Sequence, residues 1–248
     1  MSEDKEGDVV QEEQVPEAAM PEPSKKKKGR KPVVIGIVVL VVVVLGVGFK
    51  VWHDQPSFCN AICHNAMDGY IDTYDSTPGQ ATTDIWGNEV EDASGMLAAV
   101  HRVKGNATCL TCHVPTISEQ VGEAVKWASG NYLVPLDERN LTQLTEASGK
   151  QPAMFCTNDT CHTEVTLSSD GSFQYDEGFI ALAADYEFNP HAWTRNHKDF
   201  GSLECSSCHK SHRASVLYCT QCHSEAVVPD GWISYEDQSK LDKLYADI

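Results

Sequence analysis

Hydrophobic and polar positions divide the chain into parts of different character. Residues 1–32 show no apolar periodicity and carry eight acidic and seven basic side chains, six of the bases within Lys25–Lys31. Val33–Phe49 is an unbroken apolar run. Beyond residue 53, short apolar clusters alternate with long stretches rich in Gly, Ser, Asn and Asp. This pattern predicts a disordered tail, one apolar helix over 33–52, and a larger part made of short helices and loops with little sheet.

The apolar segment 33–52 has the length that a membrane-spanning helix needs, with Lys50 snorkelling and Trp52 at the interface. A cleaved signal peptide has a shorter apolar core and a small-residue cleavage site, for which Gly46-Val47-Gly48 is the candidate. The long polar region before the run favours an uncleaved anchor in membrane lipid. Because the basic cluster precedes the span, we expect a single-pass cell-membrane protein with a cytoplasmic N-terminus.

Three stretches beyond the anchor have apolar residues at helical spacing. The expected helices are Glu91–Val103, Ser118–Leu133 with Ser118 as its N-cap, and Ser239–Ile248. Residues 68–92 and 163–188 are expected to be irregular connections.

Charge narrows the choice of partner. Residues 50–248 carry 28 acidic and 12 basic side chains. Such an acidic surface excludes nucleic acid as a partner, because phosphate backbones attract basic proteins.

The ten cysteines form five pairs, and a histidine follows the second cysteine of every pair. Only 10 of the 248 residues are histidine, so five such adjacencies do not arise by chance. This is the pattern of c-type haem attachment, in which two thiols bond the porphyrin and the adjacent imidazole ligates iron. The expected thioether positions are Cys59, Cys63, Cys109, Cys112, Cys156, Cys161, Cys205, Cys208, Cys219 and Cys222. The expected proximal ligands are His64, His113, His162, His209 and His223.

Two other uses of cysteine explain the pattern less well. A disulfide scaffold explains the even count but not the histidines. Structural zinc usually takes histidines a few residues away from the cysteines. The spacer has four residues after Cys156 and three after Cys59 instead of two, and a longer spacer can bulge as a loop while both thiols still reach the ring. We therefore expect five covalently bound haem c groups, with short α-helices and irregular segments wrapped around a haem core.

The other five histidines match the five irons in number. They are His53, His101, His191, His197 and His212. We expect the last four to be distal iron ligands, and His212 to reach a neighbouring haem because it lies only three residues beyond His209. For the first haem, His53 and Met67 are the two alternatives for the distal iron ligand.

The stretch from His191 to His223 resembles the C-terminal half of small, cytochrome c3-like tetrahaem cytochromes, which share their haem arrangement with flavocytochrome c fumarate reductases. The resemblance covers roughly residues 95–225 and implies bis-histidine ligation by His101, His191, His197 and His212. The four-residue spacer and the long connection 114–155 depart from that family. No G-x-G-x-x-G occurs, so we expect no flavin domain within the chain.

Residues 33–67 resemble the NapC/NirT-type quinol dehydrogenases, in which an N-terminal anchor precedes a haem motif. The motif reads Cys59-Asn-Ala-Ile-Cys63-His64-Asn-Ala-Met67. The resemblance implies Met67 as an axial ligand, although both the spacer and the gap to Met67 are one residue longer than in that family. Asp54 and Asp68 are candidates to accept quinol protons, or are simply solvated.

These features predict five parts: a cytoplasmic tail 1–32, an anchor 33–52, a juxtamembrane first-haem segment 53–94, a tetrahaem domain 95–225 and a C-terminal tail or helix 226–248. The expected function is to pass electrons from membrane quinol, menaquinol in particular, to an extracytoplasmic reductase in anaerobic respiration. The fumarate-reductase resemblance suggests a flavoprotein as that reductase. Two alternatives stay open: a terminal reductase of a small oxyanion at an open haem, and a passive relay from another membrane complex.

Overall fold

The computed structural model describes residues 31–63, 66–134, 137–146, 149, 151–158, 160–169, 172–186, 188–192, 197 and 203–245, without the side chains of residues 62 and 63. Residues 1–30 of the predicted tail lie outside this range. The chain divides into two compact units, residues 1–46 and 47–248, and each is described by itself.

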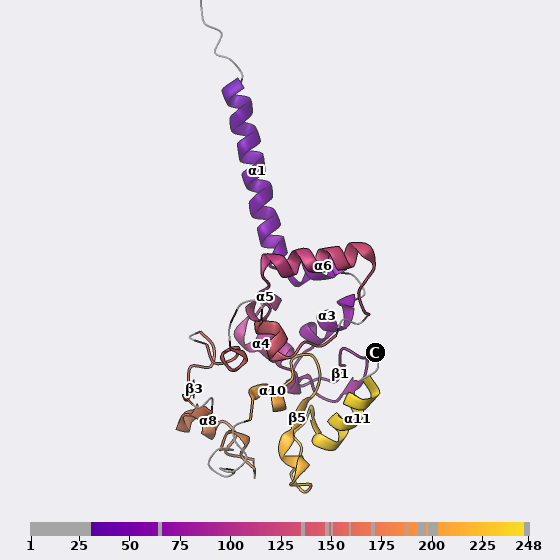
Figure 1. Ribbon diagram of the computed structural model, residues 1–248, viewed down its shortest axis with the longest axis vertical. Helices are drawn as coiled ribbons and strands as arrows, with labels where there is room; N and C mark the ends of the chain where they lie inside the picture. The colour runs from indigo at the N-terminus through magenta and orange to yellow at the C-terminus, as the bar shows by residue number, and fades with distance from the viewer. Residues whose placement is uncertain are drawn as a thin grey trace, which may run out of the picture. The chain divides into compact units, whose positions relative to one another are not determined.

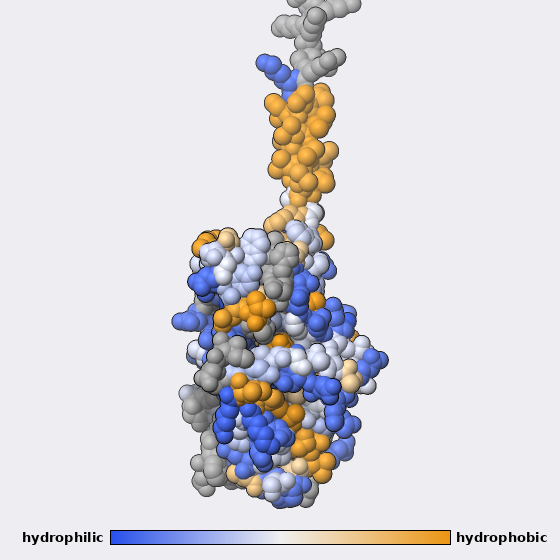
Figure 2. Space-filling view, turned by 90° about the vertical axis from the view of Figure 1, so that its right-hand side faces the viewer, coloured by the Kyte–Doolittle hydropathy of each residue, from blue (hydrophilic) through white to orange (hydrophobic). Residues whose placement is uncertain are grey.

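The first long helix is α1, Lys31–His53, and none of its side chains is buried. Within the described residues it is the one helix that is long and apolar enough to cross a membrane. Figure 2 shows its apolar side chains as a continuous band. Its length and composition make it a candidate membrane span, in agreement with the predicted segment 33–52.

The second unit consists of short helices, short strands and irregular segments (Figure 1). Its α-helices are α2 Pro56–Cys63, α3 Asp68–Asp75, α4 Leu97–Gly105, α5 Cys109–Cys112, α6 Ile117–Ser129, α7 Leu141–Thr145, α8 Glu177–Ala181, α10 Cys205–Cys208 and α11 Tyr235–Tyr245. Its 3-10 helices are η2 Ala93–Gly95, η3 Pro152–Met154, η4 Pro190–Ala192 and η5 Tyr218–Gln221.

Three two-stranded sheets complete the described fold. The antiparallel pairs are β1 Thr82–Thr83 with β2 Glu89–Val90, and β3 Val165–Leu167 with β4 Phe173–Tyr175. The parallel pair is β5 Ser215–Leu217 with β6 Trp232–Ser234, in which Ser215 lies opposite Trp232. The prediction of a mostly helical and irregular chain with little sheet is confirmed.

The prediction that 68–92 and 163–188 are irregular is wrong for part of each segment. Asp68 lies in the first turn of α3, where a carboxylate is favourable beside the positive end of the helix dipole. In the second segment, Val165 and Phe173 bury one face of the β3–β4 hairpin. These elements are too short to show periodicity in sequence, so tertiary contacts decide their structure.

Helix boundaries also differ from the expected ones, because capping groups decide them. The side chain of Asp92 accepts a hydrogen bond from Ser94 N–H and starts η2, so α4 begins at Leu97 instead of Glu91. The N-cap of α6 is Thr116 instead of Ser118, in a capping box with Glu119.

The described part of the second unit has two buried apolar clusters, and the larger one is formed by β2, η2, α4 and the residue before β5. Its buried residues are Val90, Ala93, Met96, Ala99 and Ala214. Two backbone segments approach closely there, since a side chain on Gly95 would collide with the carbonyl group of Gly231, and Gly231 has a φ of +75°. The core is thin: six of the fourteen buried apolar residues in the described part of the chain are alanines.

A buried arginine joins three distant segments. Arg213, just before β5, donates from Nε to Glu138 Oε2 at 2.7 Å, and from Nη1 to Gln238 of α11. Its guanidinium carbon also lies 5.5 Å from the centre of the Trp86 ring. The side chain is only 9% exposed, so its charge depends on these partners.

We expect Arg213→Ala to lower the free energy of unfolding by about 3 kcal/mol, because it leaves Glu138 without its partly buried cation. Arg139→Ala is the matched control: Arg139 pairs with Glu123 at 2.7 Å but is 46% exposed, so its loss costs about 0.5 kcal/mol. Thermal unfolding followed by circular dichroism measures both. Equal losses would show that the buried arginine does not tie the segments together.

Candidate functional site

Three of the cysteine–histidine motifs share one backbone geometry. The motif histidine donates its backbone N–H to the carbonyl oxygen of the first cysteine, over 2.8 Å from His113 to Cys109. The same bond measures 2.9 Å from His209 to Cys205 and 2.8 Å from His223 to Cys219. One tight helical turn thus places two thiols and an imidazole next to one another.

The third motif keeps this closing bond despite its longer spacer. His162 N–H donates to the Cys156 carbonyl oxygen at 3.1 Å. Asn158 folds the extra residues into a local turn, since its Oδ1 accepts from Thr160 N–H at 3.0 Å and its Nδ2 donates to the Phe155 carbonyl at 3.1 Å. The spacer therefore bulges while the ends of the motif stay together.

The first motif is placed only in part. Its cysteines, Cys59 and Cys63, belong to α2, whereas His64 lies outside the described residues. The His53 ring centre is 4.8 Å from that of Phe58, and its Nδ1 lies 3.2 Å from Asp54 Oδ1. Met67 is partly buried, directly before α3. The choice between His53 and Met67 as a ligand stays a prediction.

The structure brings the other eight histidines together in four pairs. Each pair contains one motif histidine and one of the expected distal histidines. The ring centres lie 6.1 Å apart for His101–His162, 6.3 Å for His113–His212, 6.4 Å for His191–His209 and 6.3 Å for His197–His223. Two metal–imidazole bonds of about 2 Å each, plus about 1 Å from each nitrogen to its ring centre, span roughly 6 Å. Each pair therefore fits one iron held between its rings.

The four pairs fall into two geometric classes. The ring planes are nearly parallel for His113–His212 at 28° and for His191–His209 at 24°. They cross steeply in the other two pairs, at 85° for His101–His162 and 75° for His197–His223.

Three distal histidines have a hydrogen-bond partner for Nδ1. His101 Nδ1 lies 2.8 Å from the Leu97 carbonyl oxygen, and His191 Nδ1 lies 3.2 Å from that of Phe179. His212 Nδ1 lies 2.8 Å from the hydroxyl of Thr73. A carbonyl accepts only, so Nδ1 carries the proton in the first two rings and Nε2 keeps its lone pair for a metal.

Desolvation favours the neutral form of two rings, the distal His212 and the motif histidine His209. It lowers the pKa of His212 to about 3 and that of His209 to about 4. Neutral imidazole is the form that binds metal. The contact from Thr73 to His212 was not predicted, because Thr73 lies in a segment expected to be irregular and a lone threonine carries no sequence signal.

Four cysteines have a raised pKa to which a cysteine of the neighbouring motif contributes. Burial is the main cause of the raised pKa of Cys109 and of Cys208, each about 11. Burial is also the main cause of the raised pKa of Cys112. In all three, a cysteine of the adjacent motif is a further cause. For Cys156, the hydrogen bond with Cys205 comes first, ahead of burial. The neighbouring cysteines are Cys59 with Cys109, Cys112 with Cys161, Cys156 with Cys205, and Cys208 with Cys219. Each motif thus has a cysteine near a cysteine of the next motif in the chain.

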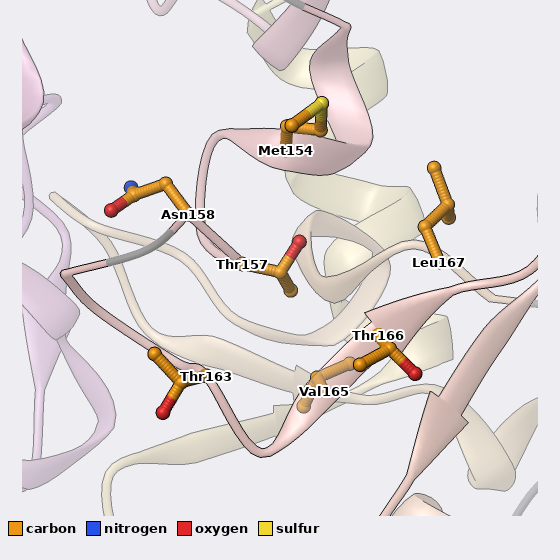
Figure 3. A pocket seen from close by; sticks show the side chains of 7 residues that line it. All are labelled: Met154, Thr157, Asn158, Thr163, Val165, Thr166 and Leu167. Carbon is orange, nitrogen blue, oxygen red and sulfur yellow. The ribbon is translucent and has the colours of Figure 1, made fainter.

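Other kinds of site find less support. In the described part of the chain, no three His, Cys, Asp or Glu side chains gather as a metal-binding group. None of the nine cysteines with described side chains forms a disulfide. A cavity of about 420 Å³ lies beside the third motif, lined by Met154, Thr157, Asn158, Thr163, Val165, Thr166 and Leu167 (Figure 3). These seven side chains include no acid, base or cation, so the cavity offers no acid–base chemistry.

Comparison with known proteins identifies the class. The chain is 49% identical over 210 residues to the cytochrome c-type protein Cgr1 of Eggerthella lenta, covering 85% of this chain and 90% of that protein. It is also 33% identical over 82 residues to the probable fumarate reductase Ifc3 of Shewanella frigidimarina, covering 27% of this chain and 12% of that protein. No protein-family model and no solved structure matches.

The chain therefore belongs to the multihaem c-type cytochromes. It is an electron-transfer protein with covalently bound haem c, and its paired imidazoles and motif cysteines suit that cofactor.

Proposed function

We propose that this protein is a membrane-anchored pentahaem cytochrome that passes electrons from membrane quinol, menaquinol in particular, to an extracytoplasmic reductase in anaerobic respiration. The observation that carries the proposal is the set of four histidine pairs beside motifs that neighbour one another in chain order. Such an order gives electrons a continuous route from the first motif to the fifth.

The residues that hold each haem follow from the pairs. Haem supplies reversible one-electron redox chemistry when bound. The motif cysteines would hold the ring covalently, and the paired imidazoles would bind the iron. In chain order from the second motif, the proximal and distal ligands are His113 with His212, His162 with His101, His209 with His191, and His223 with His197.

The packing of the chain supports a core made largely of haem. The buried protein core is thin and rich in alanine. Apolar side chains that follow the second motif remain exposed, among them Val114, Ile117, Val121 and Val125. Such side chains are costly in water and suit the face of an apolar macrocycle. The tetrahaem domain of residues 95–225 would bury them in this way.

The first motif is the proposed entry point for electrons. It lies in the segment 53–94, directly after the candidate membrane span that we take as the anchor, residues 33–52. We propose that the N-terminal tail 1–32 is cytoplasmic and the haems extracytoplasmic, as the basic residues before the span favour. The first haem would be held by Cys59, Cys63 and His64, with His53 or Met67 as its second iron ligand.

A separate reductase is the proposed electron acceptor. The similarity to a probable fumarate reductase supports a flavoprotein partner of that kind. The acidic balance of residues 50–248 would dock on a basic face of that partner. Terminal reduction of an oxyanion needs an iron with an open face, and among the described residues the four pairs leave only the first motif for this role.

The ring geometry predicts two classes of low-spin signal in electron paramagnetic resonance (EPR) spectra of the oxidised protein. Parallel imidazole planes give a rhombic signal, whereas crossed planes give a strongly anisotropic one with a larger maximum g value. We expect His191→Met to remove one rhombic component. His101→Met, the matched variant, should remove one strongly anisotropic component. A spectrum with one class only, or losses in the opposite classes, would contradict the pairing.

Quinol oxidation is tested by anaerobic mixing of the full-length, haem-loaded protein with a menaquinol analogue while the haem absorption bands are followed. We expect rapid reduction, slowed at least about tenfold in a Cys59→Ala/Cys63→Ala variant, because electrons would lose their entry point. The control is Cys219→Ala/Cys222→Ala, which removes the last haem and should keep the initial rate. Intact mass verifies the loss of one haem from each.

If menaquinol reduces neither the parent protein nor the variants while dithionite reduces all of them, the chain is a passive relay and its donor is another membrane complex. Equal rates in both variants would overturn entry at the first motif.

A further inference from the structure

Thr73 is a completely buried polar residue in α3, within the segment that follows the first motif. Its hydroxyl lies 2.8 Å from Nδ1 of His212, a histidine 139 positions further along the chain. The same hydroxyl donates to the Tyr70 carbonyl oxygen at 2.9 Å. Because its one proton is used there, the Thr73 oxygen accepts from His212 Nδ1–H. Nε2 of His212 therefore keeps its lone pair.

The surroundings hold this contact in place. Arg102 of α4 donates to the carbonyl oxygens that end α3, from Nε to Tyr74 at 2.6 Å and from Nη2 to Asp75 and Ser76 at 2.9 Å each. The Tyr70 ring packs edge-on against the His212 ring, with centres 4.9 Å apart. The main chain of His212 is also held, because Ile85 N–H donates to the His212 carbonyl oxygen at 3.2 Å.

His212 differs in this respect from the other distal histidines. His101 and His191 direct Nδ1 to backbone carbonyls, which no substitution can remove. Among the three distal histidines whose Nδ1 partner the structure gives, His212 is the one that bonds a side chain. Thr73, the partner of His212, comes from the segment that follows the first motif. The ring that faces His212 is His113, which belongs to the second motif.

We propose that Thr73 is a positioning residue for the iron ligand His212, which holds the ring nearly parallel to His113 and keeps the reduction potential of the haem at Cys109 and Cys112 low. A hydrogen bond accepted from Nδ1–H makes the imidazole a stronger electron donor, and a stronger donor favours the oxidised iron. A residue from the segment that follows the first motif thereby lowers the reduction potential of the second haem. The inference rests on the ligand pairs of the proposed function.

The test is a potentiometric titration of full-length, haem-loaded Thr73→Val, followed by optical and EPR spectra. Valine keeps the shape and removes the acceptor. We expect one haem to become easier to reduce, by about three- to tenfold in its one-electron equilibrium, as the loss of one hydrogen bond predicts. One rhombic EPR component should change with it, because the His212 ring is free to turn.

Two control variants separate the hydrogen bond from packing. Thr73→Ser keeps the hydroxyl and should restore the parent potential. Ser76→Ala removes a hydroxyl at the end of the same helix, one that donates to the Asp72 carbonyl at 2.8 Å, and should leave all potentials unchanged. Equal shifts in the valine and serine variants, or no shift in Thr73→Val, would overturn the role of Thr73. If the valine variant does not accumulate, Thr73→Ala must show the same one-haem shift.

The variant His212→Met distinguishes a failure of this inference from a failure of the ligand pairs. If His212→Met removes one rhombic component while Thr73→Val changes nothing, the pairs stand and the role of Thr73 is wrong. If His212→Met leaves every low-spin component intact, His212 is not a ligand and the proposed pairing fails with it.

Discussion

The fold depends on holding pairs of imidazole rings, brought from distant parts of the chain, with their centres 6.1 to 6.4 Å apart. That separation suits one metal between two nitrogens, and it recurs four times within one small domain. Some of these rings come from widely separated positions in the chain. His113 and His212 are 99 positions apart, and His101 and His162 are 61 apart. Iron bound between such rings would do for this chain what a large apolar core does for others.

This constraint explains why the secondary structure is sparse. A chain that wraps flat cofactors, as we propose for this one, would need short turns that present thiols and imidazoles more than long elements that pack on one another. The motif turns α5 and α10 are four residues long, and the described strands have two or three residues. Polar contacts such as Arg213 with Glu138 fix the loops between them. The hydroxyl of Thr73 likewise lies 2.8 Å from Nδ1 of His212, which we propose as an iron ligand.

Features that depend on local chemistry could be predicted from the sequence. The motifs identify the cofactor, because two thiols and an imidazole must be adjacent to attach one ring. The apolar run 33–52 is long enough to be recognised as a candidate membrane span by its length alone. Which histidines face each other could not be predicted. His101 lies nearest in sequence to the second motif, yet it faces His162 of the third. Such pairing depends on the path of the connections, which carry no periodic signal. The α3 helix and the contact from Thr73 to His212 were missed for the same reason.

We expect each of the four histidine pairs to hold one iron. Anomalous diffraction from crystals of the haem-loaded protein, collected at the iron absorption edge, locates the metal directly. It should show one iron midway between the rings of each of the four pairs, and a fifth beside Cys59. Irons that lie away from these pairs, or a pair with no iron between its rings, would refute the pairing.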